Sequence, residues 1–236
     1  MLLKVLSWNI WAGKNLDGVV KLLREVNADI IGLQEVLERN SRNNAEDLAQ
    51  KLGLNYFYCK AFTDDRHPVP KYTLGNAVLT RFPIEKSCCH QLSSLELYRK
   101  SSETEPRTAA EATLSINGKS LNFFNTHLAH SPALRESEMR DLQLNNLLKY
   151  LSNHLTILTG DFNSQADSEV IKKLSEKLIN TDKDPSRTTA VDDDEHGKFN
   201  FRKDYIFVSP DIKVTSFRIL DSDASDHYPI LAEILV

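Results

Sequence analysis

The chain has 236 residues, of which 41% are hydrophobic and 26% are charged, an ordinary composition for a globular protein. Its net charge of −4 argues against a nonspecific duplex-DNA binder, because such proteins neutralise many phosphates with lysine and arginine. No apolar run approaches the roughly 18 residues of a membrane helix, and no leader-like apolar segment precedes the first expected strand. We therefore expect a cytoplasmic monomer with one domain over residues 1–236.

The first eighty residues predict strands that alternate with helices. We expect strands at 3–7, 29–34 and 56–62. A first helix should follow Asn15, because Asn is a good N-cap and the apolar residues after it recur at helical spacing. A second helix is expected over 44–52. This alternation is typical of an α/β layer protein.

The remainder predicts shorter strands around two further helices, at 134–151 and 169–178. Asn117-Gly118 stands between two strand-like runs and predicts a tight hairpin, because both central residues of such a turn need positive φ. Residues 182–197 are acidic and rich in turn formers, so we expect a polar loop there. The fold class is thus α/β, with helices outside packed, mainly antiparallel sheets. The expected strands are 77–80, 85–91, 107–116, 120–125, 155–159, 203–208, 214–219 and 229–235.

The three cysteines, Cys59, Cys88 and Cys89, are odd in number and lack the spacing of a zinc site. We interpret all three as free thiols with a packing role or none. Free thiols fit a reducing compartment.

Polar residues recur where the expected strands end. Polar ends of neighbouring strands converge in α/β proteins, so these side chains should meet in one site. Carboxylate and amide oxygens suit a hard divalent ion such as Mg²⁺ or Mn²⁺. The residues are Asn9, Glu35, His127, Asp161, Asn163, Asp226 and His227.

Six ordered motifs make the pattern specific, and the match around them runs from residue 3 to residue 235. In this combination the chain resembles the endonuclease/exonuclease/phosphatase superfamily of metal-dependent phosphohydrolases. The resemblance implies a four-layer sandwich of two β-sheets flanked by helices, with water attack on a phosphoester at one edge. The motifs are Trp8-Asn9-Ile10, Gln34-Glu35-Val36, Asn125-Thr126-His127-Leu128, Gly160-Asp161-Phe162-Asn163, Asp204-Tyr205-Ile206 and Ser225-Asp226-His227.

Roles follow from this resemblance and from donor chemistry. As metal ligands we expect Glu35, Asn9 and Asp226, with Mg²⁺ or Mn²⁺ as cofactor.

Asp161 would orient or deprotonate the water, and Asn163 would hold water or a phosphoryl oxygen. His127 and His227 would donate to developing charge on the phosphate, and Asp204 would fix the tautomer of His227. Whether Asp161 or His227 takes the proton stays open at this stage.

Two residues are candidates for substrate binding. Arg107 resembles an arginine near the substrate phosphate in small family members, although a surface salt bridge explains it nearly as well. Asn76 fits a family strand pattern, but it could simply complete the start of a strand. Trp11 could line the cleft or pack, and Arg140 is expected to be structural.

Each site residue also has an ordinary explanation. Asn9 could cap a turn, Asp161 could make an Asx-turn, and His127 could be a satisfied core histidine. Turn chemistry gives no reason for all the motifs to occur in the family order, so we favour the functional interpretation of the set.

For the substrate we favour a nucleic-acid or nucleotide phosphoester, which makes the protein a nuclease or phosphodiesterase. The alternatives are a phosphoinositide phosphatase, a sphingomyelinase-like lipid phosphodiesterase, or a binding protein that has lost turnover. A basic amphipathic helix for a bilayer surface is missing from the sequence pattern. A local basic strip could hold a short single strand, and its candidate residues are Arg66, Lys71, Arg81, Arg99, Lys100 and Arg107.

Overall fold

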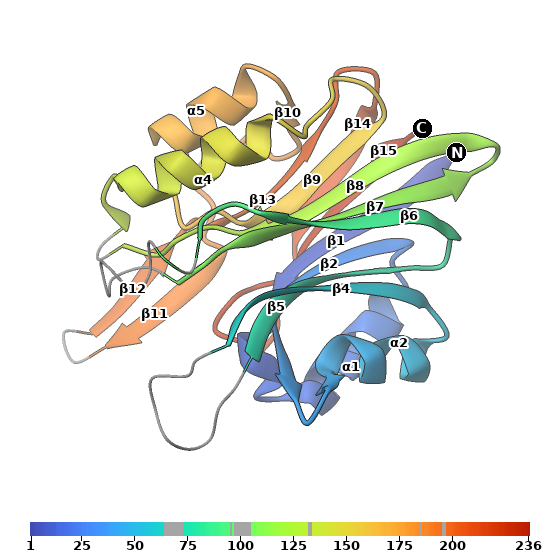
Figure 1. Ribbon diagram of the computed structural model, residues 1–236, viewed down its shortest axis with the longest axis horizontal. Coiled ribbons are helices and arrows are strands. Elements are labelled where there is room, and N and C mark those ends of the chain that lie inside the picture. The colour runs from blue at the N-terminus through green and yellow to red at the C-terminus, as the bar shows by residue number, and fades with distance from the viewer. Residues whose placement is uncertain (64–72, 95, 97–104, 132–133, 185, 195–196) are drawn as a thin grey trace.

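The computed structural model describes residues 1–63, 73–94, 96, 105–131, 134–184, 186–194 and 197–236. Within these residues the chain forms two large β-sheets, a separate hairpin and covering helices (Figure 1). The helices are η1 (Trp11–Gly13), α1 (Leu16–Val26), α2 (Asn44–Leu52), α4 (Glu138–Leu148) and α5 (Glu169–Ser175). The strands are β1 (Leu2–Asn9), β2 (Ile30–Arg39), β3 (Arg42–Asn43), β4 (Asn55–Thr63), β5 (Thr73–Thr80), β6 (Ile84–Gln91), β7 (Thr108–Ile116), β8 (Lys119–His127), β9 (Thr156–Asp161), β10 (Ile179–Asn180), β11 (Ala190–Asp194), β12 (Gly197–Phe201), β13 (Asp204–Val208), β14 (Lys213–Ile219) and β15 (Ile230–Leu235).

The two sheets confirm the expected fold class. Among the described residues, one sheet has seven strands in the order β14-β15-β1-β2-β5-β4, with β3 on β2, and the other has six in the order β10-β13-β9-β8-β7-β6. Most neighbours are antiparallel, but β1 with β2 and β8 with β9 run parallel. These parallel pairs bring the carboxyl ends of four strands to the same end of the sandwich, where the site residues lie.

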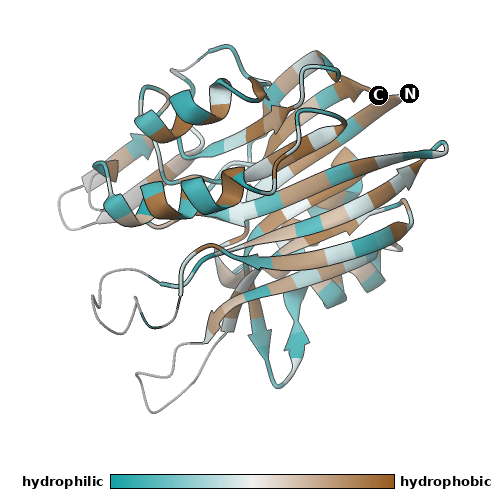
Figure 2. Ribbon diagram, turned by 45° about the horizontal axis from the view of Figure 1, so that its top comes forward, coloured by the Kyte–Doolittle hydropathy of each residue, from teal (hydrophilic) through white to brown (hydrophobic). Residues whose placement is uncertain are grey.

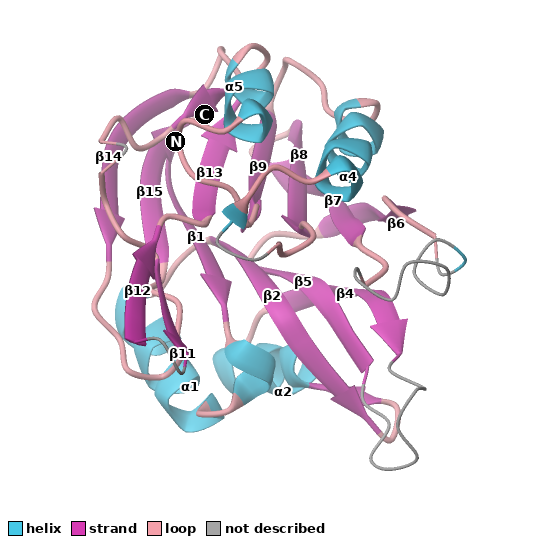
Figure 3. Ribbon diagram, turned by 90° about the vertical axis from the view of Figure 1, so that its left-hand side faces the viewer, coloured by secondary structure: helices cyan, strands magenta, loops and turns pink. Residues whose placement is uncertain are grey.

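The molecule has four layers, as Figure 3 shows. Helices α1 and α2 cover the outer face of the seven-stranded sheet, and α4 and α5 cover the six-stranded sheet. Between the sheets lies an apolar cluster that includes Val5, Ile30, Phe123 and Ile206. Figure 2 colours the strands largely brown, while the helices alternate brown and teal, as expected for elements with one buried face. Among the described residues, no helix is long and apolar enough to cross a membrane.

The helices begin at side-chain caps. The Asn15 side chain accepts a hydrogen bond from the Gly18 amide (3.0 Å), so the expected N-cap is confirmed. Ser137 caps α4 in the same way. The helix predicted from residue 134 therefore begins later, at Glu138. Helical spacing alone missed this start, because Leu134 stands at a position that fits the helical spacing of the leucines after it.

The polar loop predicted at 182–197 is wrong over its second half. Ala190–Asp194 pairs antiparallel with Gly197–Phe201 to form the β11–β12 hairpin, which projects from the end of the sandwich in Figure 1. Three consecutive aspartates have poor strand propensity, so the sequence pattern gave no strand signal. The hairpin starts beside the site, where the Val191 amide donates to the Asp226 carbonyl (2.9 Å).

The prediction that the second strand ends before Glu35 is also wrong. Strand β2 runs on to Arg39, and its register with β5 shifts between Leu33 and Val36. This β-bulge turns the Glu35 backbone into the left-handed region, at φ +53°. Bulges re-aim side chains near active sites, and here the bulge places Gln34 in the interior and Glu35 towards the site.

The interpretation of all three cysteines as free thiols is wrong for two of them. Cys59 on β4 and Cys89 on β6 form a disulfide, and within the described residues Cys88 is free and exposed. Because β4 and β6 are edge strands of different sheets, this bond joins the two sheets at one side. The cysteines thus no longer support a reducing compartment.

A buried polar network joins the sheets directly behind the site. The Asn125 side chain donates to the carbonyls of Leu33 (2.8 Å) and Ala77 (2.9 Å), on the opposite sheet. Its oxygen accepts from Gln34 Nε2 (2.6 Å) and Thr159 Oγ1 (3.0 Å). The carbonyls flank the β-bulge, so the network fixes the strand distortion that positions Glu35.

Candidate active site

The site lies where strand ends from both sheets meet. Strand β1 contributes Asn9, β2 contributes Glu35, and β8 contributes His127. Strand β9 ends at Asp161, and β13 begins at Asp204, paired directly with it. The loops after β9 and before β15 add Asn163 and His227.

Asn9 is the central hydrogen-bond donor. Its Nδ2 donates to Glu35 Oε1 (3.0 Å) and to Asp161 Oδ2 (3.2 Å), so one amide holds carboxylates from two sheets. Its Oδ1 accepts from the Trp11 amide (3.1 Å). Asn9, Glu35 and Asp161 therefore lie together, with Asn9 almost fully buried.

The two carboxylate oxygens of Asp161 have different partners, one in a turn and the other in the site. Oδ1 accepts from the Asn163 amide (2.9 Å), which is the Asx-turn that the sequence also allowed. Oδ2 faces Asn9, His127 Nε2 (3.4 Å) and His227 Nε2 (3.7 Å). Burial raises the pKa of Asp161, but the electrostatic influence of the neighbouring His127, His227 and Lys203, with the hydrogen bond from the Asn163 amide, outweighs this and holds it at about 2. The carboxylate is thus ionised at neutral pH.

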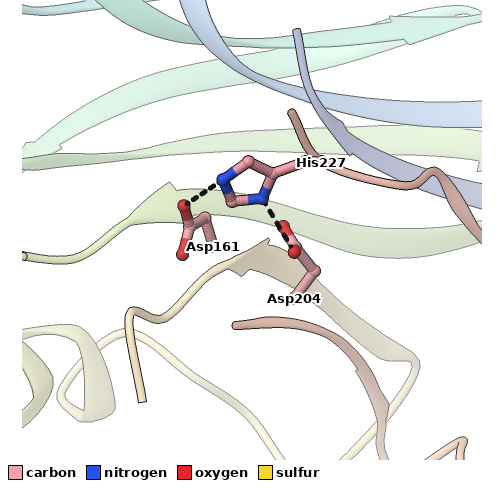
Figure 4. A group of neighbouring side chains, drawn as sticks. All are labelled: Asp161, Asp204 and His227. Atoms are coloured by element: carbon pink, nitrogen blue, oxygen red, sulfur yellow. Dashed lines mark hydrogen bonds and ion pairs between the residues drawn. The ribbon is translucent and has the colours of Figure 1, made fainter. Parts of the chain in front are cut away.

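His227 lies between two carboxylates, as Figure 4 shows. Its Nδ1 donates to Asp204 Oδ2 (2.9 Å), and its Nε2 faces Asp161. Burial lowers the pKa of His227, but Asp204 and Asp161 together raise it to about 10. Ligand atoms of the three side chains lie within 4.8 Å of one another, close enough for a cation once the His227 ring has lost its proton.

The backbone around His227 is tied to strand β1. Trp8 Nε1 donates to the His227 carbonyl (2.9 Å). The Ser225 hydroxyl donates to the Asn9 carbonyl (2.7 Å) and accepts from the His227 amide (3.2 Å). These bonds explain why the first and last motifs of the chain form one site.

His127 is held as a neutral acceptor. Asn163 Nδ2 donates to His127 Nε2 (3.0 Å) and to the Leu128 carbonyl (3.0 Å). Burial, together with the charge of Arg107, lowers the pKa of His127 well below its ordinary value. A neutral ring whose Nε2 accepts carries its proton on Nδ1.

Arg107 and Asn76 line a small pocket together with Glu35, His127 and Phe62. The Arg107 guanidinium is almost completely buried, pairs with Glu105 (3.0 Å), and keeps a buried Nε without a hydrogen-bond partner. Asn76 Nδ2 donates to the Thr108 carbonyl (2.9 Å), so its amide also links the two sheets.

The donor set fits a divalent cation. Burial is the main cause that raises the pKa of Glu35. The hydrogen bond from Asn9 and the charge of His227 lower it, and Asp226 and Asp161 add smaller raising effects. The net rise shows that the neighbours of Glu35 do not fully offset the burial of its negative charge. A hard cation bound by carboxylate and amide oxygens would relieve this imbalance.

Asp226 lies apart from the other candidate ligands. Its Oδ1 accepts from the Ser225 hydroxyl (3.1 Å), and the residue lines a separate pocket with Asp221, Asp223 and Tyr228. It reaches Glu35 only through longer-range charge.

The proposed basic strip does not form around Arg81. This residue pairs with Asp29 (2.9 Å) just after β5, at the end opposite to the site. The other strip candidates apart from Arg107 lie outside the described residues. They are Arg66, Lys71, Arg99 and Lys100.

Arg140 has the structural role expected from its sequence. It is fully buried and donates to the Ala129 carbonyl (3.2 Å) and the Ser131 hydroxyl (3.1 Å). It thereby fixes the loop that follows His127.

Sequence reasoning missed two supporting residues. Thr189 Oγ1 accepts from the amides of Lys203 (2.9 Å) and Asp204 (3.1 Å), and so fixes the carboxylate behind His227. Lys203 is buried beside the site and adds positive charge near Asp161. Lys203 directly precedes the Asp-Tyr-Ile motif, and this position is the sequence signal that could have identified it.

The sequence that contains the site residues matches a known protein family. A sequence model of the endonuclease/exonuclease/phosphatase family matches residues 6–227, a range that contains every site residue described above. The chain belongs to this family.

Solved structures of the family share the fold at low sequence identity. A family member from Beutenbergia cavernae superposes with a TM-score of 0.84 and 20% identity, over 100% of this chain and 72% of that one. A mannosyl-6-phosphatase from Bacteroides thetaiotaomicron gives 0.74 and 21%, over 99% of this chain and 100% of that one. TDP2 from D. rerio, complexed with a single-strand DNA product, gives 0.75 and 16%, over 100% of this chain and 99% of that one.

Proposed function

We propose that the protein is a divalent-metal-dependent phosphoester hydrolase whose substrate is a nucleic acid or nucleotide. The observation that carries this proposal is one continuous chain of contacts. It runs from Glu35 through Asn9 and Asp161 to the charged His227 and its partner Asp204. Family membership supports the same reaction class.

Glu35 would hold Mg²⁺ or Mn²⁺, with Asp226 as an outer contributor. When bound, the ion neutralises charge on the phosphate and on the leaving oxygen. The Asn9 oxygen would join Glu35 as a ligand with its amide reversed, because in this structure Oδ1 accepts from the Trp11 amide and Nδ2 faces the two carboxylates.

The protonation states of the remaining residues give each of them a different role in the reaction. Both nitrogens of His227 face carboxylates, which makes the ring a donor; it is suited to stabilise a phosphoryl oxygen as negative charge develops. Asp161 is an ionised acceptor and is suited to orient the attacking water through Oδ2, although its low pKa makes it a weak base. Asp204 accepts a hydrogen bond from the His227 ring and so fixes its orientation. On the other side of Asp161, the Asn163 side chain donates to neutral His127.

Arg107 supports phosphate recognition, because a buried guanidinium with a free Nε beside His127 is a preformed anion contact. Asn76 would line the same pocket. TDP2, a relative of this fold, is complexed with a single-strand DNA product, which favours a nucleic-acid substrate. Because a mannosyl-6-phosphatase has a similar fold, sugar phosphates are also included among the candidate substrates to be tested.

The test is hydrolysis of bis(p-nitrophenyl) phosphate with Mn²⁺, followed by a panel of oligonucleotides, nucleotides, sugar phosphates, inositol phosphates and sphingomyelin. Turnover should stop in EDTA and in His227→Ala. The matched control is His154→Ala, because exposed His154 also pairs with a carboxylate, Asp211 (2.6 Å), away from the site. Full activity in EDTA would contradict the metal role, and binding without any turnover would support the binding-protein alternative.

A further inference from the structure

An exposed tryptophan stands directly beside the site. Trp11 follows strand β1, and its backbone amide donates to the Asn9 side chain (3.1 Å). Its side chain keeps 40% exposure, whereas Trp8, three residues earlier, is fully buried. Trp11 therefore contributes little to the core, although a large aromatic is the residue that folding would most readily bury.

The turn that carries Trp11 is strained. Trp11, Ala12 and Gly13 all have positive φ, at 47°, 54° and 70°. Two of them carry side chains, for which this region is unfavourable. Such strain persists where surrounding contacts enforce it, and it gathers at functional sites.

The enforcing contacts are specific. The Gly13 amide donates to the Ile10 carbonyl (2.8 Å), and the Lys14 amide donates to the Trp11 carbonyl (3.0 Å). From helix α2, Asn44 Nδ2 donates to the Ala12 carbonyl (3.0 Å). These contacts fix the backbone of Trp11 next to Asn9 and leave its indole exposed.

A cation accompanies the indole. Lys14 Nζ lies 3.5 Å from the centre of the Trp11 ring. An aromatic face and an ammonium group together recognise a flat ring that carries a phosphate, since the base stacks and the phosphate pairs with the charge. The ammonium covers one face of the ring, so a base would stack on the face that Lys14 leaves uncovered.

We propose that Trp11 and Lys14 form a subsite for the nucleotide next to the scissile phosphoester, with Trp11 stacking on its base and Lys14 contacting its phosphate. This inference rests on the proposed function, because it names the substrate group that this site would take. It makes Trp11 a specificity-determining residue for substrates that carry a base.

The test uses the two tryptophans as reporters. The Asp161→Asn variant, which under the proposed function binds without turnover, is titrated in Mg²⁺ with a thymidine tetranucleotide and with a matched abasic tetramer. Tryptophan emission and the anisotropy of fluorescein-labelled tetramers are followed. The thymidine tetramer should quench the emission and bind at least about fivefold more tightly than the abasic one.

The variants are made in that same background. Trp11→Ala should abolish the quench, since buried Trp8 is then the sole tryptophan, and should weaken thymidine binding at least about fivefold without changing abasic binding. Trp11→Phe should restore most of the affinity, and Lys14→Gln should weaken both ligands. Tyr56→Ala is the control, because Tyr56 is equally exposed (40%) but lies on β4 away from the site.

Equal binding of both tetramers, or no binding of the thymidine tetramer, would overturn the inference. So would an unchanged affinity in Trp11→Ala. If bis(p-nitrophenyl) phosphate is hydrolysed while these results are negative, the inference alone fails. If bases stack on Trp11 but no phosphoester is hydrolysed, the proposed function fails and the nucleotide subsite stands.

Discussion

Replacing Asn125 with alanine tests whether the buried network positions the site. Asn125 is fully buried and takes part in four hydrogen bonds, two of them to carbonyls beside the β-bulge of the opposite sheet. At about 1 kcal/mol net for each bond, the substitution should lower the free energy of unfolding by about 4 kcal/mol. This loss is a large part of the free energy of unfolding of about 5–15 kcal/mol that is typical of folded proteins. The substitution also removes the side-chain hydrogen bonds to the carbonyls of Leu33 and Ala77.

The assay is urea unfolding at equilibrium, with the rate of phosphoester hydrolysis measured under native conditions. The matched control is Asn122→Ala on the same strand. Asn122 is half-buried and accepts one bond from Thr113 (3.2 Å), so its loss should cost about 1 kcal/mol at most. An Asn125→Ala protein destabilised by less than about 1 kcal/mol would refute the reasoning that this network joins the sheets.

Two further predictions concern His227 and the turn before α1. In the metal-free protein, NMR titration should find His227 protonated at pH 8, and Asp204→Asn should lower its pKa, which the two carboxylates raise to about 10. Because this pKa lies above the ordinary 6.5, the His227–Asp204 pair stabilises the fold fully below pH 6.5 and loses that contribution as the pH rises towards 10; a His227 that titrates near 6.5 would contradict the geometry. Gly13→Ala should destabilise the fold by more than Gly53→Ala in thermal unfolding, and it should also lower activity. Both glycines have positive φ, but a Cβ on Gly13 would collide with the Asn44 amide, whereas a Cβ on Gly53 meets nothing within 4 Å; equal effects would contradict this.

Most of the architecture follows from local sequence patterns. Apolar periodicity and capping residues located α1, and the Asn117-Gly118 turn forms with both residues at positive φ, as expected. The site residues could be grouped because they share strand ends, which needs only the order of motifs along the chain. The helix cap and the turn are encoded within a few residues, whereas the grouping of the site residues depends on motifs spread along the chain.

What the sequence did not predict depends on contacts between distant segments. The bulge at Glu35 is buttressed by Asn125, ninety residues later, which donates to the carbonyls of the residue pair beside it. Cys59 and Cys89 meet only because the edges of two sheets coincide. Likewise, the β11–β12 hairpin forms from residues whose own propensity opposes a strand.

The most direct test of the central claim is the dependence of the hydrolysis rate on Mn²⁺ concentration in the parent, Glu35→Ala and His227→Ala proteins. Glu35→Ala should shift half-saturation to higher Mn²⁺, because a ligand is lost, and should also lower the rate. His227→Ala should lower the maximal rate by about 100-fold or more while half-saturation stays nearly unchanged, since the ring acts on the phosphate. Identical half-saturation in all three proteins would contradict the assignment of Glu35 to the metal, and an undiminished rate in His227→Ala would contradict the proposed reaction.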